Sequence, residues 1–137
     1  MAEKRIYVDT NVFIDFFEDR NDGLRPLGEL ASQLFQRAFG CEFRIITSSL
    51  VLKELKDNNH LDDYTEFVRQ NKKFNKFEFV NIANSDKAAA SKGKNSHYQD
   101  RLHYILAEKA NAELFITRNW KDFCGLGKIP VLLPEYA

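Results

Sequence analysis

Short apolar runs that favour β-strand alternate with longer stretches of helical periodicity, and this alternation constrains the fold more than any other feature of the sequence. The pattern begins with a strand at residues 5–9, and a short amphipathic helix follows through Phe17. Alternating strands and helices are typical of domains in which a parallel sheet carries helices on both faces. The sequence therefore predicts an α/β fold, a three-layer α/β/α sandwich with a mainly parallel central sheet.

The remaining elements follow from apolar spacing and from residues that start or stop helices. Apolar positions recur at helical spacing over residues 27–39, and Gly40 provides a stop for this helix. Ser48 or Ser49 can cap the helix that follows the second strand. Further helices are expected over 50–58, 61–71 and 99–112, strands over 43–49, 76–82, 113–117 and 129–134, a helix or a loose connection over 85–96, and a short helix or turn over 119–123.

Length and charge limit the class of protein. With 137 residues, of which 44% are hydrophobic, the chain is expected to form a single domain over 1–137. Lys+Arg and Asp+Glu both number 20, which argues against a strongly basic nucleic-acid coat but allows a local basic patch. The N-terminus lacks the apolar segment of a signal peptide, and no apolar run is long enough to cross a membrane. We therefore expect a cytoplasmic protein that does not bind membranes.

An acid, Asp9, stands where the first strand ends, and a charge at such a place is costly unless something pairs with it. In open α/β sheets, ligands bind outside the carboxyl ends of the strands. Glu54, Asp100 and Asp122 follow in separate segments and could meet Asp9 at that edge. Taken singly, each has a simpler explanation. Glu54 suits a solvated helix face, Asp100 the start of a helix, and Asp122 a turn or a cap.

Several carboxylates gathered in one place either raise their pKa values or bind a cation. A site made only of oxygen atoms suits Mg²⁺ or Mn²⁺ better than zinc. The three histidines, His60, His97 and His103, have no spacing typical of metal ligands, and Cys41 and Cys124 lie far apart. A hard divalent ion is therefore the expected cofactor.

Three segments resemble a known family when they are taken in their order along the chain: "VDTNVFID", "ITSSLVLKEL" and "QDRLHYILAEKANAELFITRNWKDF". Together they resemble the PIN domain, a nuclease fold shared by toxins of bacterial and archaeal toxin–antitoxin pairs and by RNA-processing enzymes. The resemblance implies an α/β/α sandwich whose acids hold Mg²⁺ or Mn²⁺ in a cleft and which cuts RNA phosphodiester bonds.

The same resemblance implies roles for individual residues. The catalytic acids and metal ligands are Asp9, Glu54 and Asp100. Small polar residues that support such acids match Thr10, Asn11 and Thr117. The fourth position departs from the commonest pattern, because Asn119 stands where many members have an acid. Asp122 comes three residues later and, like Asn119, is a candidate to complete the metal site.

Two residues after the penultimate strand are candidates for RNA binding. Arg118 lies next to the proposed cleft and could contact phosphate groups, which supply most non-specific affinity for nucleic acids. It could equally be a solvated charge in a turn. Trp120 could stack on a base or anchor the turn in the core.

The expected function is that of a metal-dependent endoribonuclease, the toxin of a toxin–antitoxin pair, whose partners are RNA, an antitoxin protein and a second copy in a homodimer. A stand-alone RNA-processing nuclease and a catalytically weakened RNA- or protein-binding domain are the alternatives. Asn119 favours the latter, and the three acids argue against it. A haloacid dehalogenase-like enzyme would have a second acid where Asn11 stands, and the paired acids of a receiver domain are also missing.

Overall fold

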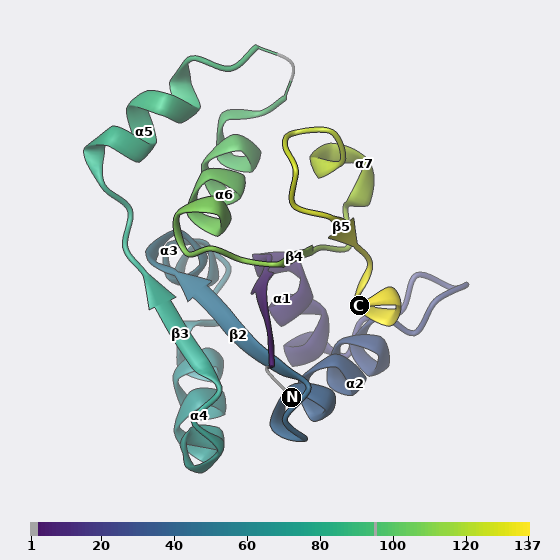
Figure 1. Cartoon of the computed structure of the whole chain (residues 1–137). Helices are drawn as coiled ribbons and strands as arrows, with labels where there is room; N and C mark the ends of the chain where they lie inside the picture. The colour runs from purple at the N-terminus through teal and green to yellow at the C-terminus, as the bar shows by residue number, and fades with distance from the viewer. Residues whose placement is uncertain (1–2, 95) are drawn as a thin grey trace.

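A parallel sheet forms the centre of the protein in the computed structural model, which describes residues 3–94 and 96–137. Within these residues the sheet has five strands in the order β3-β2-β1-β4-β5, and every neighbouring pair is parallel (Figure 1). The strands are β1 (Lys4–Val8), β2 (Phe43–Ser48), β3 (Phe77–Val80), β4 (Leu114–Ile116) and β5 (Val131–Leu132). The predicted α/β class with a parallel sheet is confirmed.

Helices cover both faces of this sheet (Figure 1). They are α1 (Thr10–Glu18), α2 (Leu27–Phe39), α3 (Ser49–Asp57), α4 (Leu61–Asn71), α5 (Asn84–Ser91), α6 (Tyr98–Lys109) and α7 (Trp120–Phe123), with short 3₁₀ turns at Lys72–Phe74 and Pro134–Tyr136. Strands β1 to β3 step in one direction across the sheet, whereas β4 and β5 lie on the other side of β1. Because parallel crossovers are right-handed, α1 to α4 fall on one face and α5 to α7 on the other.

Aromatic side chains pack on both sides of the sheet, between helices on one side and between the sheet and α7 on the other. On one side Phe13 of α1 stacks on Phe35 of α2 with ring centroids 5.3 Å apart. On the other side Tyr7 of β1 stacks on its neighbour Phe115 of β4, and the ring centroid of Phe115 lies 4.5 Å from that of Phe123 in α7. These side chains are almost completely buried, so the sheet lies inside a continuous core.

The strand order places a crevice at one position on the sheet edge. The chain returns past β1 to form β4, so the carboxyl ends of β1 and β4 flank the point where the strand order reverses. Ligands of open α/β sheets bind at such a point. Asp9 directly follows β1, Thr117 directly follows β4, and the N–H of Asp9 donates to the carbonyl of Ile116 at 2.9 Å.

Most predicted elements agree with the structure, and the differences have local causes. Ser48 is the residue that caps α3, since its Oγ accepts the N–H of Val51 at 3.2 Å. The segment 85–96, for which helix and loose connection were both open, is helical as far as Ser91, and Asn95 lies outside the described residues. The last strand is shorter than the predicted 129–134, because it pairs only with the short strand β4 and is flanked by Pro130 and Pro134.

In the part of the chain that the structure describes, none of the helices combines the length and the apolar character that crossing a membrane requires.

Candidate functional site

Asp9 is fixed by hydrogen bonds on both carboxylate oxygens. Its Oδ1 accepts the N–H of Thr10 at 2.8 Å, which caps helix α1. Its Oδ2 accepts the Asn11 side-chain amide at 3.0 Å and the Thr117 hydroxyl at 2.8 Å. The residue is only 5% exposed. Burial raises the pKa of Asp9 despite these donors, so the folded protein holds this charge at a cost.

Glu54 reaches the same place from α3. Its Oε1 accepts the Thr10 hydroxyl at 2.5 Å and lies 2.7 Å from Nε2 of His103. Burial works against ionisation of this carboxyl group, but the hydrogen bonds from His103 and Thr10 outweigh it and lower the pKa of Glu54. Glu54 is therefore ionised at neutral pH.

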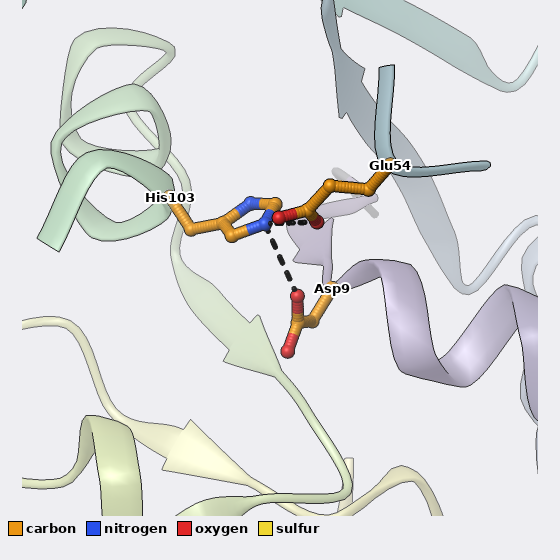
Figure 2. Close-up of side chains that lie close together, drawn as sticks. All are labelled: Asp9, Glu54 and His103. Atoms are coloured by element: carbon orange, nitrogen blue, oxygen red, sulfur yellow. Dashed lines mark hydrogen bonds and ion pairs between the residues drawn. The ribbon is translucent and has the colours of Figure 1, made fainter. Parts of the chain in front are cut away.

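His103, which the sequence did not point to, lies between the two acids (Figure 2). Its Nε2 is 3.5 Å from Asp9 Oδ1 as well as 2.7 Å from Glu54, and only 2% of the residue is exposed. Burial lowers the pKa of His103, but the carboxylates of Asp9 and Glu54 more than offset this and raise it. One signal could have found it. His103 stands three residues after Asp100, so the two share a face of α6.

Asp100 lies in the first turn of α6 and is partly buried. Burial raises the pKa of its carboxyl group, and so do the negative charges of Asp9 and Asp122. Asp100 accepts no hydrogen bond from a side chain in the described residues. Its charge is therefore not compensated in the way that the charges of Asp9 and Glu54 are.

These residues line a cleft of about 280 Å³ at the carboxyl ends of β1 and β4, and its lining includes Asp9, Glu54, Asp100, His103 and Asn119. A neighbouring hollow of about 420 Å³ shares Asp100 and is also lined by Lys94, His97, Lys121 and Asp122. Of the two candidates for the fourth position, Asn119 thus belongs to the cleft and Asp122 to the hollow beside it.

The small polar residues named in the sequence surround the acids. Thr117 is fully buried, and its Oγ accepts the N–H of Asn119 at 3.0 Å while its hydroxyl donates to Asp9. Asn11 bridges the same two segments, since its Oδ1 accepts the N–H of Arg118 at 3.2 Å. The loop after β4 and the start of α1 are therefore tied together around Asp9.

Arg118 is already paired within the protein. Its Nε donates to Oδ2 of Asp15 in α1 at 2.8 Å, where the Asp15 side chain is 4% exposed and that of Arg118 is 29% exposed. Trp120, at the start of α7, is 45% exposed. Its ring is therefore available at the surface, whereas the Nε side of the Arg118 guanidinium is bonded to Asp15.

The donor set fits a divalent cation. One atom each of Asp9, Glu54 and His103 lies within 4.8 Å of the others, and Asp100 adds a third carboxylate to the cleft. No lysine or arginine is among the described residues that line the cleft. Apart from His103, which Asp9 and Glu54 share, the three carboxylates therefore have no cationic side chain among the described lining residues to balance them, and carboxylate oxygens are the ligands that Mg²⁺ and Mn²⁺ prefer.

Comparisons with known proteins place the fold. A family model described as PIN domain matches residues 6–128. A solved structure described as a toxin-antitoxin complex from Klebsiella pneumoniae is similar, with a TM-score of 0.61 and 23% sequence identity over 94% of this chain and 97% of that chain. No curated protein sequence matches this chain. At this identity the structural likeness shows the fold alone.

Proposed function

This chain belongs to the PIN domain family, and on that premise we propose that it is a nuclease that uses Mg²⁺ or Mn²⁺ to hydrolyse RNA phosphodiester bonds. The observation that carries this proposal is the convergence of three carboxylates on one cleft. Asp9 comes from the end of β1, Glu54 from α3 and Asp100 from α6. A cation offsets the cost of holding these charges together, which explains why a buried strand ends in an acid.

Each acid has a separate task in this proposal. Asp9 and Asp100 hold the cation, and Glu54 is a further ligand or orients the attacking water. A bound ion of this kind lowers the pKa of its water, polarises a phosphoryl oxygen and stabilises the leaving oxygen. Thr10, Asn11 and Thr117 keep the carboxylates in place through the hydrogen bonds given above.

The position of the fourth acid holds an uncharged residue, Asn119. Asn119 lines the cleft and can hydrogen-bond to a water or phosphate there, whereas Asp122 lies in the neighbouring hollow. We propose that Asp122 acts on the site only through its charge, which it exerts on Asp100.

The neighbouring hollow supplies the cationic groups that an RNA strand needs. Lys94 and Lys121 line it, and it joins the cleft at Asp100. We propose that phosphates flanking the cut site lie there, since phosphate contacts supply most of the non-specific affinity. Trp120 stands beside Lys121 with nearly half of its surface exposed and is placed to stack on a base. Arg118 remains a proposed RNA contact only through the part of its guanidinium that does not face Asp15.

We further propose that the chain is the toxin of a toxin–antitoxin pair, with an antitoxin protein that blocks the cleft. The similar structure from Klebsiella pneumoniae, a toxin-antitoxin complex, supports this role. A homodimer remains a prediction. The alternative of a catalytically weakened binding domain rests on Asn119, the uncharged residue at the fourth position.

The test compares the protein with its Asp9→Asn variant on a pool of single-stranded and structured RNA, with Mn²⁺, Mg²⁺ or EDTA. A matched control is Asp62→Asn, the same change at an exposed position of α4. We expect cleavage that needs the metal, persists in the control and disappears in Asp9→Asn. Cleavage that survives in EDTA or in Asp9→Asn would refute the assignment of the site.

The same variants test the toxin role. Expression of the wild-type chain in a bacterium should arrest growth, and expression of Asp9→Asn should not. Cleavage in vitro without growth arrest would favour a stand-alone RNA-processing nuclease. No cleavage, together with no stabilisation of the folded protein by Mn²⁺, would favour the binding domain.

A further inference from the structure

We propose that His103 is a positioning residue rather than a metal ligand: Ser48 and Tyr7 fix the tautomer that carries a proton on Nε2, and this N–H orients Glu54. The inference rests on the proposed function, because it concerns how the acids of that site are arranged. It begins from a row of buried polar groups that leads from the core to the cleft.

The row has four members at hydrogen-bond distance. Ser48 Oγ lies 2.8 Å from the hydroxyl of Tyr7, which lies 2.8 Å from Nδ1 of His103. On the other side of the ring, Nε2 lies 2.7 Å from Oε1 of Glu54. Ser48 and Tyr7 are fully buried and His103 nearly so, so each of their protons must find its acceptor within the protein.

Ser48, at the end of the row in the core, determines which group donates and which accepts in each hydrogen bond. The N–H of Val51 donates to Ser48 Oγ at 3.2 Å, which occupies one lone pair of that oxygen. The hydroxyl proton of Ser48 then needs an acceptor, and the Tyr7 hydroxyl is the one that the described residues offer it. Tyr7 in turn donates its own proton to Nδ1 of His103. In a neutral ring Nδ1 is therefore an acceptor, and the ring proton lies on Nε2.

If the hydrogen bonds ran in the opposite order, a group at each end of the row would be destabilised. If Nδ1 donated to Tyr7 and Tyr7 donated to Ser48, the buried Ser48 proton would have no acceptor among the described residues, and an unpaired buried donor is destabilising. A neutral ring would then also turn the lone pair of Nε2 toward the ionised carboxylate of Glu54 at 2.7 Å. In a neutral ring, the arrangement with a proton on Nε2 avoids both penalties. A charged ring carries a proton on Nε2 as well, so this nitrogen donates to Glu54 in either form.

A protonated ring nitrogen cannot bind a metal ion, since a metal-ligating histidine needs a free lone pair. Glu54 receives both of its donors, Thr10 and His103, on the same oxygen, Oε1. Its other oxygen, Oε2, accepts no hydrogen bond from the described residues and is left for the cation. The site is thereby confined to oxygen ligands, which favours Mg²⁺ and Mn²⁺ over metals that prefer imidazole nitrogen.

The direct test reads the tautomer of His103. Long-range ¹H–¹⁵N correlation spectra of the ¹⁵N-labelled protein, with the ring signals identified by their absence in His103→Gln, should show Nε2 protonated without metal and with Mg²⁺. An unprotonated Nε2, or a proton on Nε2 that is lost when Mg²⁺ binds, would overturn the proposal. This readout does not depend on RNA cleavage, so failure of the proposed function and failure of this inference are distinguishable.

A second test uses Tyr7→Phe, which keeps the aromatic ring stacked on Phe115 and removes the hydroxyl. Without that donor, the tautomer with a free Nε2 becomes accessible. Zn²⁺ should then bind about tenfold more tightly relative to Mg²⁺, as judged from thermal stabilisation by each ion. Tyr104→Phe is the matched control, because it removes a hydroxyl that bonds to Ile129 and not to the site. An unchanged preference in Tyr7→Phe would overturn the proposal.

A third test asks whether a conservative substitution of His103 preserves stabilisation by Mg²⁺. His103→Gln keeps an N–H that can donate to Glu54, whereas His103→Leu removes it. We expect Mg²⁺ to stabilise His103→Gln nearly as much as the wild type and His103→Leu much less. Equal losses in the two variants would contradict a role based on donation to Glu54.

Discussion

Replacing Asp100 by Asn should stabilise the protein without metal and destabilise it with metal. The change removes one negative charge and preserves the shape of the side chain. Because Asp100 accepts no hydrogen bond from a side chain in the described residues, the substitution should break none. It therefore isolates the electrostatic contribution of one acid more cleanly than Asp9→Asn, which would disturb the bonds from Asn11 and Thr117.

The direction without metal follows from the pKa of Asp100. Burial, together with the charges of Asp9 and Asp122, raises this pKa in the folded protein. A group with a raised folded pKa stabilises the fold below its unfolded pKa and loses that contribution as the pH rises through the folded value. At pH 7 the ionised Asp100 therefore lowers the free energy of unfolding. Its removal should add about 0.5 kcal/mol to the free energy of unfolding, the size of interactions between partly exposed charges.

With metal the order should reverse. A ligand at a hundred times its dissociation constant stabilises the folded state by about 2.7 kcal/mol. If the loss of Asp100 weakens binding about a hundredfold, the same concentration gives the variant only about 0.4 kcal/mol. One kcal/mol shifts the melting temperature of a domain of this size by about 4 °C. Mn²⁺ should thus raise the melting temperature of the wild type by roughly 10 °C and that of the variant by roughly 2 °C.

The assay is thermal unfolding at pH 7 in EDTA and over a series of Mn²⁺ concentrations, with Asp62→Asn as the control. When melting temperature is plotted against Mn²⁺ concentration, the curve of Asp100→Asn should cross that of the wild type. The curve of the Asp62→Asn control should run parallel to that of the wild type. In EDTA the gap between Asp100→Asn and the wild type should close below about pH 4, where carboxyl groups become neutral. Equal stabilisation of both proteins by Mn²⁺ would refute the view that a cation balances these acids.

Three further predictions concern residues outside the acids. Asp63 and Glu18 raise the pKa of His60, so the wild type should be more stable than His60→Gln below about pH 6.5. This difference in the free energy of unfolding should shrink as the pH rises further, and denaturant unfolding at several pH values measures it. Arg118→Ala should lower the free energy of unfolding by about 2 kcal/mol, because the buried Asp15 then loses its side-chain hydrogen bond and keeps only the ion pair with Arg20 at 3.8 Å. An unchanged denaturation midpoint would contradict this. Trp120→Ala should weaken the binding of single-stranded RNA by about 1–3 kcal/mol in a filter or fluorescence assay while the melting temperature stays within the error of measurement.

The sequence was sufficient for the layers of the fold because burial patterns are local. Helices α2 and α4 begin and end where apolar spacing placed them, and the alternation of elements gave the parallel sheet. The convergence of Asp9, Glu54 and Asp100 on one cleft could also be expected, since parallel strands share one carboxyl edge.

What could not be predicted depends on how distant elements dock. His103 enters the site only because α6 packs over Tyr7, so that the face of the helix bearing Asp100 and His103 turns toward β1. That rotation is a tertiary property. The spacing of three residues shows that Asp100 and His103 share a helix face, but not the direction in which that face turns. Likewise, nothing near Arg118 in the sequence shows that Asp15, 103 residues earlier, takes its guanidinium.

The hydrogen bond between Thr117 and Asp9 joins residues 108 positions apart, and this separation has a consequence during synthesis of the protein. Asp9 is synthesised before Asp100, His103 and Thr117, so the residues of the cleft leave the ribosome at widely separated times. A nascent chain that stops before β4 has a central strand without one of its neighbours and a cleft without one wall. The complete cleft can therefore form only once the segment through Thr117 has been synthesised, and the proposed nuclease activity cannot precede it.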